Sequence, residues 1–138
     1  MDLDENAVVA AMCEHLRNQG YVIDSYCKAA EKGIDIVAHH PDTRSNVFVE
    51  AKGETSSREG SERAGKGFSS SQIFNRVSKG VFTCLQLRSR DENAKIILAL
   101  PANPRFREYV DTVSRQLEVV RVDVWYAPTT EPCSDEKL

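Results

Sequence analysis

Two acids and a lysine are spaced so that they could assemble one site for acid, base or metal chemistry. Residues 48–55 read FVEAKGET, an apolar strand that ends in charge. Because alternate side chains of a strand share a face, Glu50 and Lys52 point the same way and Ala51 points the other. The acid Asp35 interrupts the apolar run GIDIV of the strand before it. If these two strands pair, Asp35 and Glu50 lie side by side with Lys52 close to both.

Paired carboxylates repel each other unless a cation lies between them, so this arrangement indicates a metal site. Ligands that are all oxygen favour Mg²⁺ or Mn²⁺, and we expect Asp35, Glu50 and the carbonyl of Ala51 to bind it. The metal would polarise a phosphate and acidify a water, which Lys52 would orient or deprotonate. The expected chemistry is phosphodiester hydrolysis. The alternative for the charged pair is an ion pair across strands at a sheet edge, which contributes little to stability.

The rest of the chain supplies the elements that position these residues. Apolar periodicity and helix-start signals predict helices at 4–19, 71–90 and 103–117. Shorter apolar runs between turn signals predict strands at 21–28, 34–39, 46–52, 95–101 and 119–127. The order α-β-β-β-α-β-α-β predicts an α/β domain over residues 1–127, with a mixed central sheet and helices on both sides. Residues 128–138 are predicted to form a frayed C-terminal tail.

Positive charge gathers in the middle of the chain, where residues 44–90 hold nine Lys and Arg against four Asp and Glu. This asymmetry indicates a polyanionic partner. The segment 53–70 is rich in Gly, Ser and charge and is predicted to be a mobile loop with a function. Its candidate contacts with a nucleic acid are Arg58, Arg63 and Lys66, although these bases alternate with acids.

The helix after this loop is predicted to present two different sides. Its apolar side holds Ile73, Val77, Val81, Cys84 and Leu85. Arg76 and Lys79 share a stripe beside that side, where they would meet phosphates or simply form hydrated surface.

The sequence GID, ending at Asp35, and the sequence EAK, from Glu50 to Lys52 after fourteen intervening residues, resemble the PD-(D/E)xK nuclease superfamily. This superfamily includes restriction endonucleases and Holliday-junction resolvases. The order α-β-β-β-α-β is similar to its common core, over roughly residues 4–127. The resemblance implies a restriction endonuclease-like fold and Mg²⁺-dependent hydrolysis of DNA by an endonuclease or exonuclease. Ile34 stands where the name of the motif has Pro, a position without a chemical role.

Two further residues are candidates for roles at this site. Glu5 continues the core-facing stripe of the first helix whereas Glu14 falls on the opposite side, so Glu5 is the acid expected to support the metal. The alternative for Glu5 is a capping box with Asp2. The resemblance implies that Gln72 borders the active site, and the alternative there is a helix cap with Ser69.

The bulk properties predict a cytoplasmic protein with no membrane span. The apolar fraction of 41% and charged fraction of 28% are typical of soluble globular proteins. The four cysteines are scattered, which favours buried thiols in a reducing compartment over zinc.

The expected partner is DNA, recognised with low sequence specificity because the chain has no room for a separate recognition domain. Specificity would then come from DNA structure or from a protein partner. Analogy with the superfamily adds a homodimer formed through the last helix or strand. The main alternative is a catalytically silent nucleic-acid-binding module or subunit with the same fold. A protein-interaction domain with structural charges is the third possibility.

Overall fold

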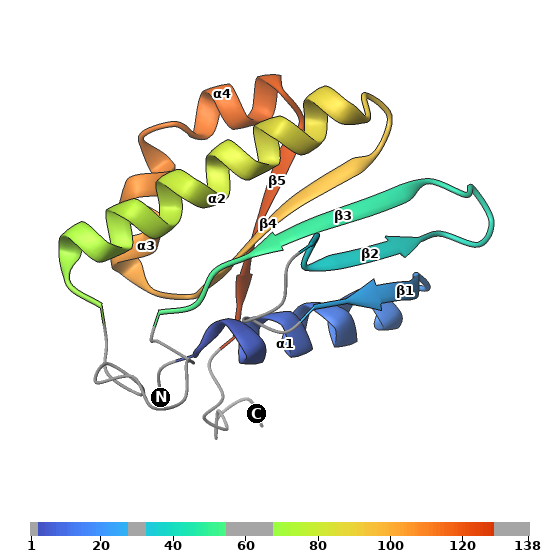
Figure 1. Ribbon diagram of the computed structural model, residues 1–138, viewed down its shortest axis with the longest axis horizontal. Helices are drawn as coiled ribbons and strands as arrows, with labels where there is room; N and C mark the ends of the chain where they lie inside the picture. Colours follow the sequence, from blue (N-terminus) through green and yellow to red (C-terminus); the bar gives the residue numbers. More distant parts are fainter. Residues whose placement is uncertain (1–2, 28–32, 55–67, 129–138) are drawn as a thin grey trace, which may run out of the picture.

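The computed structural model describes residues 3–27, 33–54 and 68–128, which form a five-stranded sheet with helices on both faces (Figure 1). The elements in chain order are α1 (Glu5–Asn18), β1 (Val22–Tyr26), β2 (Ile36–His39), β3 (Asn46–Ala51), α2 (Ser70–Arg90), β4 (Lys95–Pro101), α3 (Pro104–Asp111), α4 (Ser114–Val119) and β5 (Val122–Ala127). The strands lie side by side in this same order, antiparallel from β1 to β3 and parallel from β3 to β5. The predicted α/β class with a mixed sheet is confirmed.

The sheet separates two hydrophobic cores, and its central strand is β3. On one face α1 packs against Val47, Val49 and Ala51 of β3. On the other face α2, α3 and α4 pack against alternate residues of β4, among them Ile96 and Leu98. Because helices cover both faces of β4, its whole run KIILALP is apolar, apart from the exposed lysine at its start. The charged end of β3 therefore lies in the middle of the sheet and not at its edge.

The buried side of α2 differs from the predicted one in its C-terminal half. Ile73, Val77 and Cys84 are buried as expected, whereas Leu85 is 38% exposed and Leu87 is buried instead. Steps of three and four residues keep side chains on one face of a helix, and one residue beyond Cys84 turns the side chain away by about 100°. Leu85 therefore points outward.

The predicted helix at 103–117 is two helices, because the chain breaks between α3 and α4. The Thr112 hydroxyl donates to the carbonyl of Tyr109 at 2.6 Å, and the Ser114 hydroxyl donates to the carbonyl of Asp111 at 3.2 Å. Short hydroxyl side chains that bond nearby carbonyls compete with helical hydrogen bonds. The observed order is thus α-β-β-β-α-β-α-α-β.

Three predicted strands begin later than expected, at Val22, Ile36 and Val122. Asp35 therefore lies directly before β2 and not within it. Most of the predicted loop at 53–70 and the tail at 128–138 lie outside the described residues. Among the helices in the described ranges, none has the length and apolar character that crossing a membrane requires.

One arginine ties the far end of α2 to the sheet. The guanidinium of Arg88 donates five hydrogen bonds of 2.7–3.1 Å to backbone carbonyls, those of Asp91, Glu92, Ala94, Val120 and Arg121. Two connections, α2 to β4 and α4 to β5, are thereby held against the end of the same helix. Charged donors to backbone carbonyls are the stronger class of hydrogen bond.

We predict that Arg88→Ala lowers the free energy of unfolding by roughly 2–4 kcal/mol, because several carbonyls lose a charged donor at once. Urea denaturation measures this loss. The exposed Arg90 of the same helix provides the control, and Arg90→Ala is expected to change stability by less than about 0.5 kcal/mol. Equal losses in the two variants would contradict the structural role of Arg88.

Candidate active site

Strand pairing brings the two predicted acids together. In the antiparallel pair of β2 and β3, Ile36 lies opposite Val49. The next pair in this register is Asp35 and Glu50, and their side chains lie on the α2 side of the sheet, away from that of Ala51. A carboxylate oxygen of Asp35 accepts the backbone N–H of Ala51 at 2.7 Å. The Glu50 carboxyl, when protonated, donates a second hydrogen bond to Asp35.

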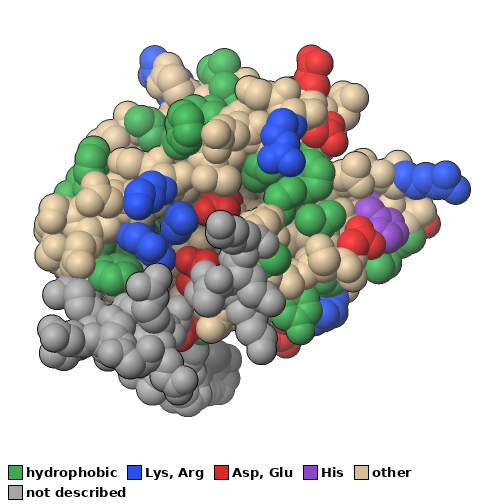
Figure 2. Space-filling view, viewed as in Figure 1, with side chains coloured by type: hydrophobic (Ala, Val, Ile, Leu, Met, Phe, Trp, Pro, Cys, Tyr) green, Lys and Arg blue, Asp and Glu red, His purple; other side chains and the backbone are tan. Residues whose placement is uncertain are grey.

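Lys52 completes the cluster. Its amino group lies 2.9 Å from a carboxylate oxygen of Glu50, and both side chains are largely buried. This ion pair differs from the alternative, because it joins two residues at the end of the central strand and neither crosses between strands nor lies at a sheet edge. Asp35 and Glu50 are only 7% and 8% exposed. Figure 2 shows Lys and Arg side chains gathered beside acidic ones on this face of the molecule.

Burial raises the pKa of both carboxyls, and that of Glu50 rises from 4.5 to about 7. For Glu50, the charge of Asp35 is the next cause, and Lys52 opposes the rise. For Asp35, the N–H of Ala51 is the largest opposing influence. Near neutral pH the pair therefore retains a proton between two oxygens, which is a position that a divalent cation can fill.

The oxygen donors at this position fit Mg²⁺ or Mn²⁺. In a strand, the N–H and C=O of one residue point to the same side. The carbonyl of Ala51, like its N–H, therefore points from β3 towards Asp35. Within the described ranges, no three His, Cys, Asp or Glu side chains are arranged as a metal site. An ion here would thus rest on two carboxylates, one carbonyl and oxygens from water or substrate, as is common for Mg²⁺.

Glu5 reaches the same cluster from the N-terminus of α1. The N-cap of α1 is Asp4, whose side chain accepts the N–H of Ala7 at 2.8 Å. The capping box that paired Asp2 with Glu5 is therefore wrong, and Glu5 is not committed to the cap. Its carboxylate accepts a hydrogen bond of 3.1 Å from Arg76 of α2. Burial raises the pKa of Glu5, with Asp35 as the next cause.

Two glycines that sequence analysis did not single out allow these elements to approach. A Cβ atom on the buried Gly53 would lie closer than 3.0 Å to the backbone of Asp4 and Glu5. A Cβ on Gly80 of α2 would lie 2.8 Å from Leu98 and 3.5 Å from the stem of Lys52. The available signals were a glycine directly after EAK and a glycine in the buried stripe of a helix.

Glu54, previously assigned to the loop, is instead a buried anchor. It is 9% exposed, and its carboxylate accepts the N–H of Leu3 at 3.0 Å and the side-chain amide of Asn103 at 2.9 Å. The two residues after Lys52 are therefore fixed, and the predicted mobile loop can begin only beyond them.

Gln72 forms the capping box that was its alternative role. The Ser69 N–H donates to the Gln72 side chain at 2.8 Å, and the Gln72 N–H donates to the Ser69 hydroxyl at 3.3 Å. Its place beside the active site stays a prediction.

The predicted phosphate contacts differ in their surroundings. Arg76 is half-buried, with its guanidinium 5.4 Å from the centre of the Phe68 ring, and its buried Nε has no hydrogen-bond partner among the described residues. Lys79 is exposed. The other predicted contacts lie outside the described residues, namely Arg58, Arg63 and Lys66.

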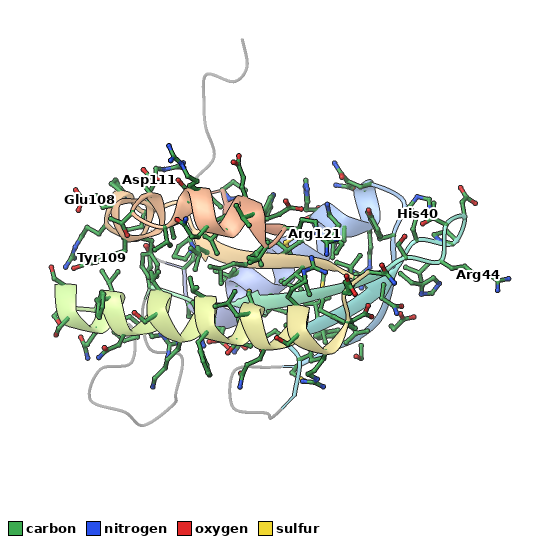
Figure 3. The ribbon with its side chains drawn as sticks, turned by 90° about the horizontal axis from the view of Figure 1, so that it is seen from above. His40, Arg44, Glu108, Tyr109, Asp111 and Arg121 are labelled. Carbon is green, nitrogen blue, oxygen red and sulfur yellow. The ribbon has the colours of Figure 1, made fainter. Side chains whose placement is uncertain are left out.

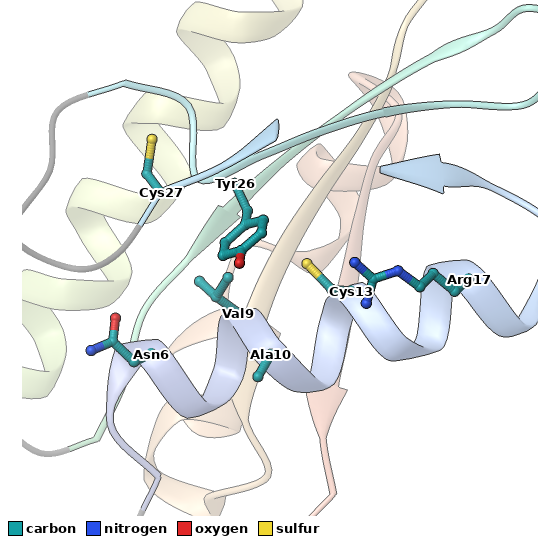
Figure 4. A pocket seen from close by; sticks show the side chains of 7 residues that line it. All are labelled: Asn6, Val9, Ala10, Cys13, Arg17, Tyr26 and Cys27. Atoms are coloured by element: carbon teal, nitrogen blue, oxygen red, sulfur yellow. The ribbon is translucent and has the colours of Figure 1, made fainter. Parts of the chain in front are cut away.

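A hollow of about 350 Å³ lies between α1 and β1 and differs from the acid cluster in chemical character (Figure 4). Its lining includes Cys13, Arg17, Tyr26 and Cys27, and none of its lining residues is acidic. Burial raises the pKa of the Cys13 thiol, which keeps it protonated and weakly nucleophilic. The acid cluster is therefore the better candidate for catalysis.

We predict that, without divalent metal, the protein loses stability as the pH rises from about 5 to about 8. The folded state holds the Glu50 proton up to a pKa of about 7, above its ordinary value of 4.5. The protonated Glu50 carboxyl therefore adds roughly 3 kcal/mol to the free energy of unfolding below pH 4.5. This contribution disappears as the pH rises through about 7. Urea denaturation in EDTA measures this slope.

The variant Glu50→Gln keeps the size of the side chain and should lose most of this slope, while Glu14→Gln, an exposed acid of α1, should retain it. Added Mn²⁺ should restore stability at the higher pH in the parent protein and in Glu14→Gln, but not in Glu50→Gln. A slope that is unchanged in Glu50→Gln would show that this carboxyl is not the titrating group.

Comparison with known proteins adds no family to this geometry. No family model matches the chain, and neither a curated protein nor a solved structure matches it. Any function assigned to the acid cluster therefore rests on the arrangement of its own residues.

Proposed function

We propose that this chain is a metal-dependent nuclease that hydrolyses DNA phosphodiester bonds on a restriction endonuclease-like core. The observation that carries the proposal is the buried, hydrogen-bonded pair of Asp35 and Glu50, with the amino group of Lys52 2.9 Å from Glu50. The order α-β-β-β-α-β and the GID and EAK sequences add support, through their resemblance to the PD-(D/E)xK superfamily.

Asp35, Glu50 and the carbonyl of Ala51 would hold Mg²⁺ or Mn²⁺. When bound, the ion would polarise a phosphate oxygen and lower the pKa of a coordinated water. Lys52 would orient that water and offset the negative charge that develops on the phosphate. The stem of Lys52 lies against Gly80, and this contact limits the positions open to its amino group.

Arg76 and Glu5 would control how the phosphate backbone enters. The pair neutralises two charges beside the acids, so the metal-free site does not present three bare carboxylates to a polyanion. Since the Nε of Arg76 has no partner in the part of the chain that the structure describes, it has hydrogen-bonding capacity left for a phosphate oxygen. Sequence specificity would come from DNA structure or from a protein partner.

The rival function is a module that binds nucleic acid without cleaving it. Such a module would gain nothing from two buried carboxyls, which repel phosphate and cost stability when both are ionised. Their raised pKa values therefore favour the catalytic proposal. Cleavage by the purified protein distinguishes the two functions.

The decisive experiment incubates the protein with duplex, single-stranded and branched DNA in Mg²⁺, Mn²⁺ or EDTA. We predict metal-dependent cleavage, and we expect Lys52→Ala to lower its rate by roughly 100- to 1,000-fold. DNA affinity should remain nearly intact, because one charge among several contributes little to binding.

Lys95→Ala is the matched control, since Lys95 belongs to the neighbouring strand and pairs with the exposed Asp123. It should cleave like the parent. Cleavage that persists in EDTA, or that is unchanged in Lys52→Ala, would refute the proposed roles of metal and lysine.

A second prediction separates Arg76 from Lys79. The exposed Lys79 is free to meet a phosphate, so Lys79→Ala should reduce the salt dependence of binding to duplex DNA by about one unit of slope. Arg76→Ala should weaken binding for an additional reason, because it leaves the charge of Glu5 without its partner. Adding Glu5→Gln should restore part of the affinity lost in Arg76→Ala and none of that lost in Lys79→Ala.

Fluorescence anisotropy over a salt series, with catalysis blocked by Ca²⁺ or EDTA, measures both effects. If neither arginine nor lysine replacement changes affinity at any salt concentration, the DNA does not pass along this side of α2.

A further inference from the structure

A hydrophobic groove follows the outer side of α2, where it lies beside α3 (Figure 3). The groove has a volume of about 310 Å³ and is lined by residues of α2 and by residues in and just after α3. Phe74 and Phe82 are 51% and 61% exposed. The ring of Phe74 meets that of Tyr109 in α3 with centroids 5.4 Å apart, so the two helices share one surface. Contiguous exposed apolar side chains of this kind mark a protein interaction site.

The groove side of α2 carries no charge. Its exposed residues are Ser71, Phe74, Ser78, Phe82, Leu85 and Ser89. Lys79 points about 100° around the helix from Ser78, towards the side that bears Arg76. Few charges and exposed aromatic rings characterise the core of a protein interface. A strongly charged partner would find no counter-charge here.

The two exposed phenylalanines of α2 are placed symmetrically about Ser78, so their spacing is the same in either direction along the helix. Phe74 and Phe82 each lie four residues from Ser78, one before it and one after it. If two copies of α2 cross antiparallel at Ser78, Phe74 of one copy lies beside Phe82 of the other, and the reverse contact forms as well. The small serine at the crossing lets the two helices approach closely.

We propose that the groove side of α2, together with α3, is the interface of a homodimer whose two α2 helices cross antiparallel at Ser78. Such an interface is isologous, because the same patch serves on both copies. None of the residues that line the groove is charged, so the linings of two copies can meet without like-charge repulsion. The side of α2 that carries Arg76 and Lys79 remains open in this dimer, so the interface is independent of the proposed nuclease activity.

Molecular mass in solution tests the interface. Light scattering during gel filtration, over a micromolar concentration series, should give twice the chain mass of 15.4 kDa for the parent protein. Phe82→Arg should raise the dissociation constant of the dimer by roughly 100-fold or more, because the symmetry places two charges and two lost contacts in one interface. Circular dichroism confirms that the variant is folded.

Tyr26→Arg is the control, because Tyr26 is 55% exposed on β1 and does not line the groove. It should dimerise like the parent, as should the catalytic variant Lys52→Ala. A parent protein that remains a monomer at every concentration, or a Phe82→Arg variant that dimerises as well as the parent, would overturn the proposal.

Cross-linking tests the position of the crossing. In a background with Cys27→Ser and Cys133→Ser, Ser78→Cys should form an intermolecular disulfide on mild oxidation. Ser71→Cys, two turns away on the same side of α2, should not, because antiparallel crossing separates the two copies of that residue by about 21 Å. Cross-linking of Ser71→Cys as rapidly as Ser78→Cys would exclude this geometry.

Discussion

The hydrogen-bonded pair of buried carboxyls, Asp35 and Glu50, is the constraint around which the surrounding structure is arranged. Two acids that face each other across the centre of a sheet cannot both ionise without a nearby positive charge, and burial sharpens this conflict. The chain relieves it with the backbone N–H of Ala51, with the amino group of Lys52 and with a proton retained near neutral pH. A divalent cation would relieve it more fully, and this is the basis of the proposed metal site, which two carboxylates and a carbonyl would form.

Close backbone contacts bring helices from both faces of the sheet up to this pair of acids. Gly53 lets the end of β3 touch the N-terminus of α1, which brings Glu5 to the cluster. Gly80 lets α2 lie close to Lys52 and Leu98. Glu54 then fixes the chain that leaves β3. The candidate site thus draws on both helical layers, although Asp35, Glu50 and Lys52 all lie in or directly beside two neighbouring strands.

The sequence alone was sufficient for the features that depend on local periodicity. Asp35, Glu50 and Lys52 could be placed together because alternate strand residues share a face and because neighbouring strands were expected to pair. Features that depend on contacts between distant segments could not be derived in this way. Asp4 and Asp2 are equally good caps by residue type, and only the fold selects Asp4. The break near Thr112 likewise follows from hydroxyl contacts that compete with a helix whose apolar pattern continues through it.

The energetic cost of the acid pair is itself an argument about function. Amides in place of Asp35 and Glu50 would keep the shape and hydrogen-bonding capacity of both side chains and would remove the repulsion between them. A chain under no demand other than folding, or other than holding a polyanion, would be more stable and more attractive to phosphate with those amides. Buried groups that are unfavourable for stability and for simple binding tend to occur where chemistry requires them. The pairs Glu5 with Arg76 and Glu50 with Lys52 fit this view, because each pairing limits the cost of the acids that the proposed metal site requires.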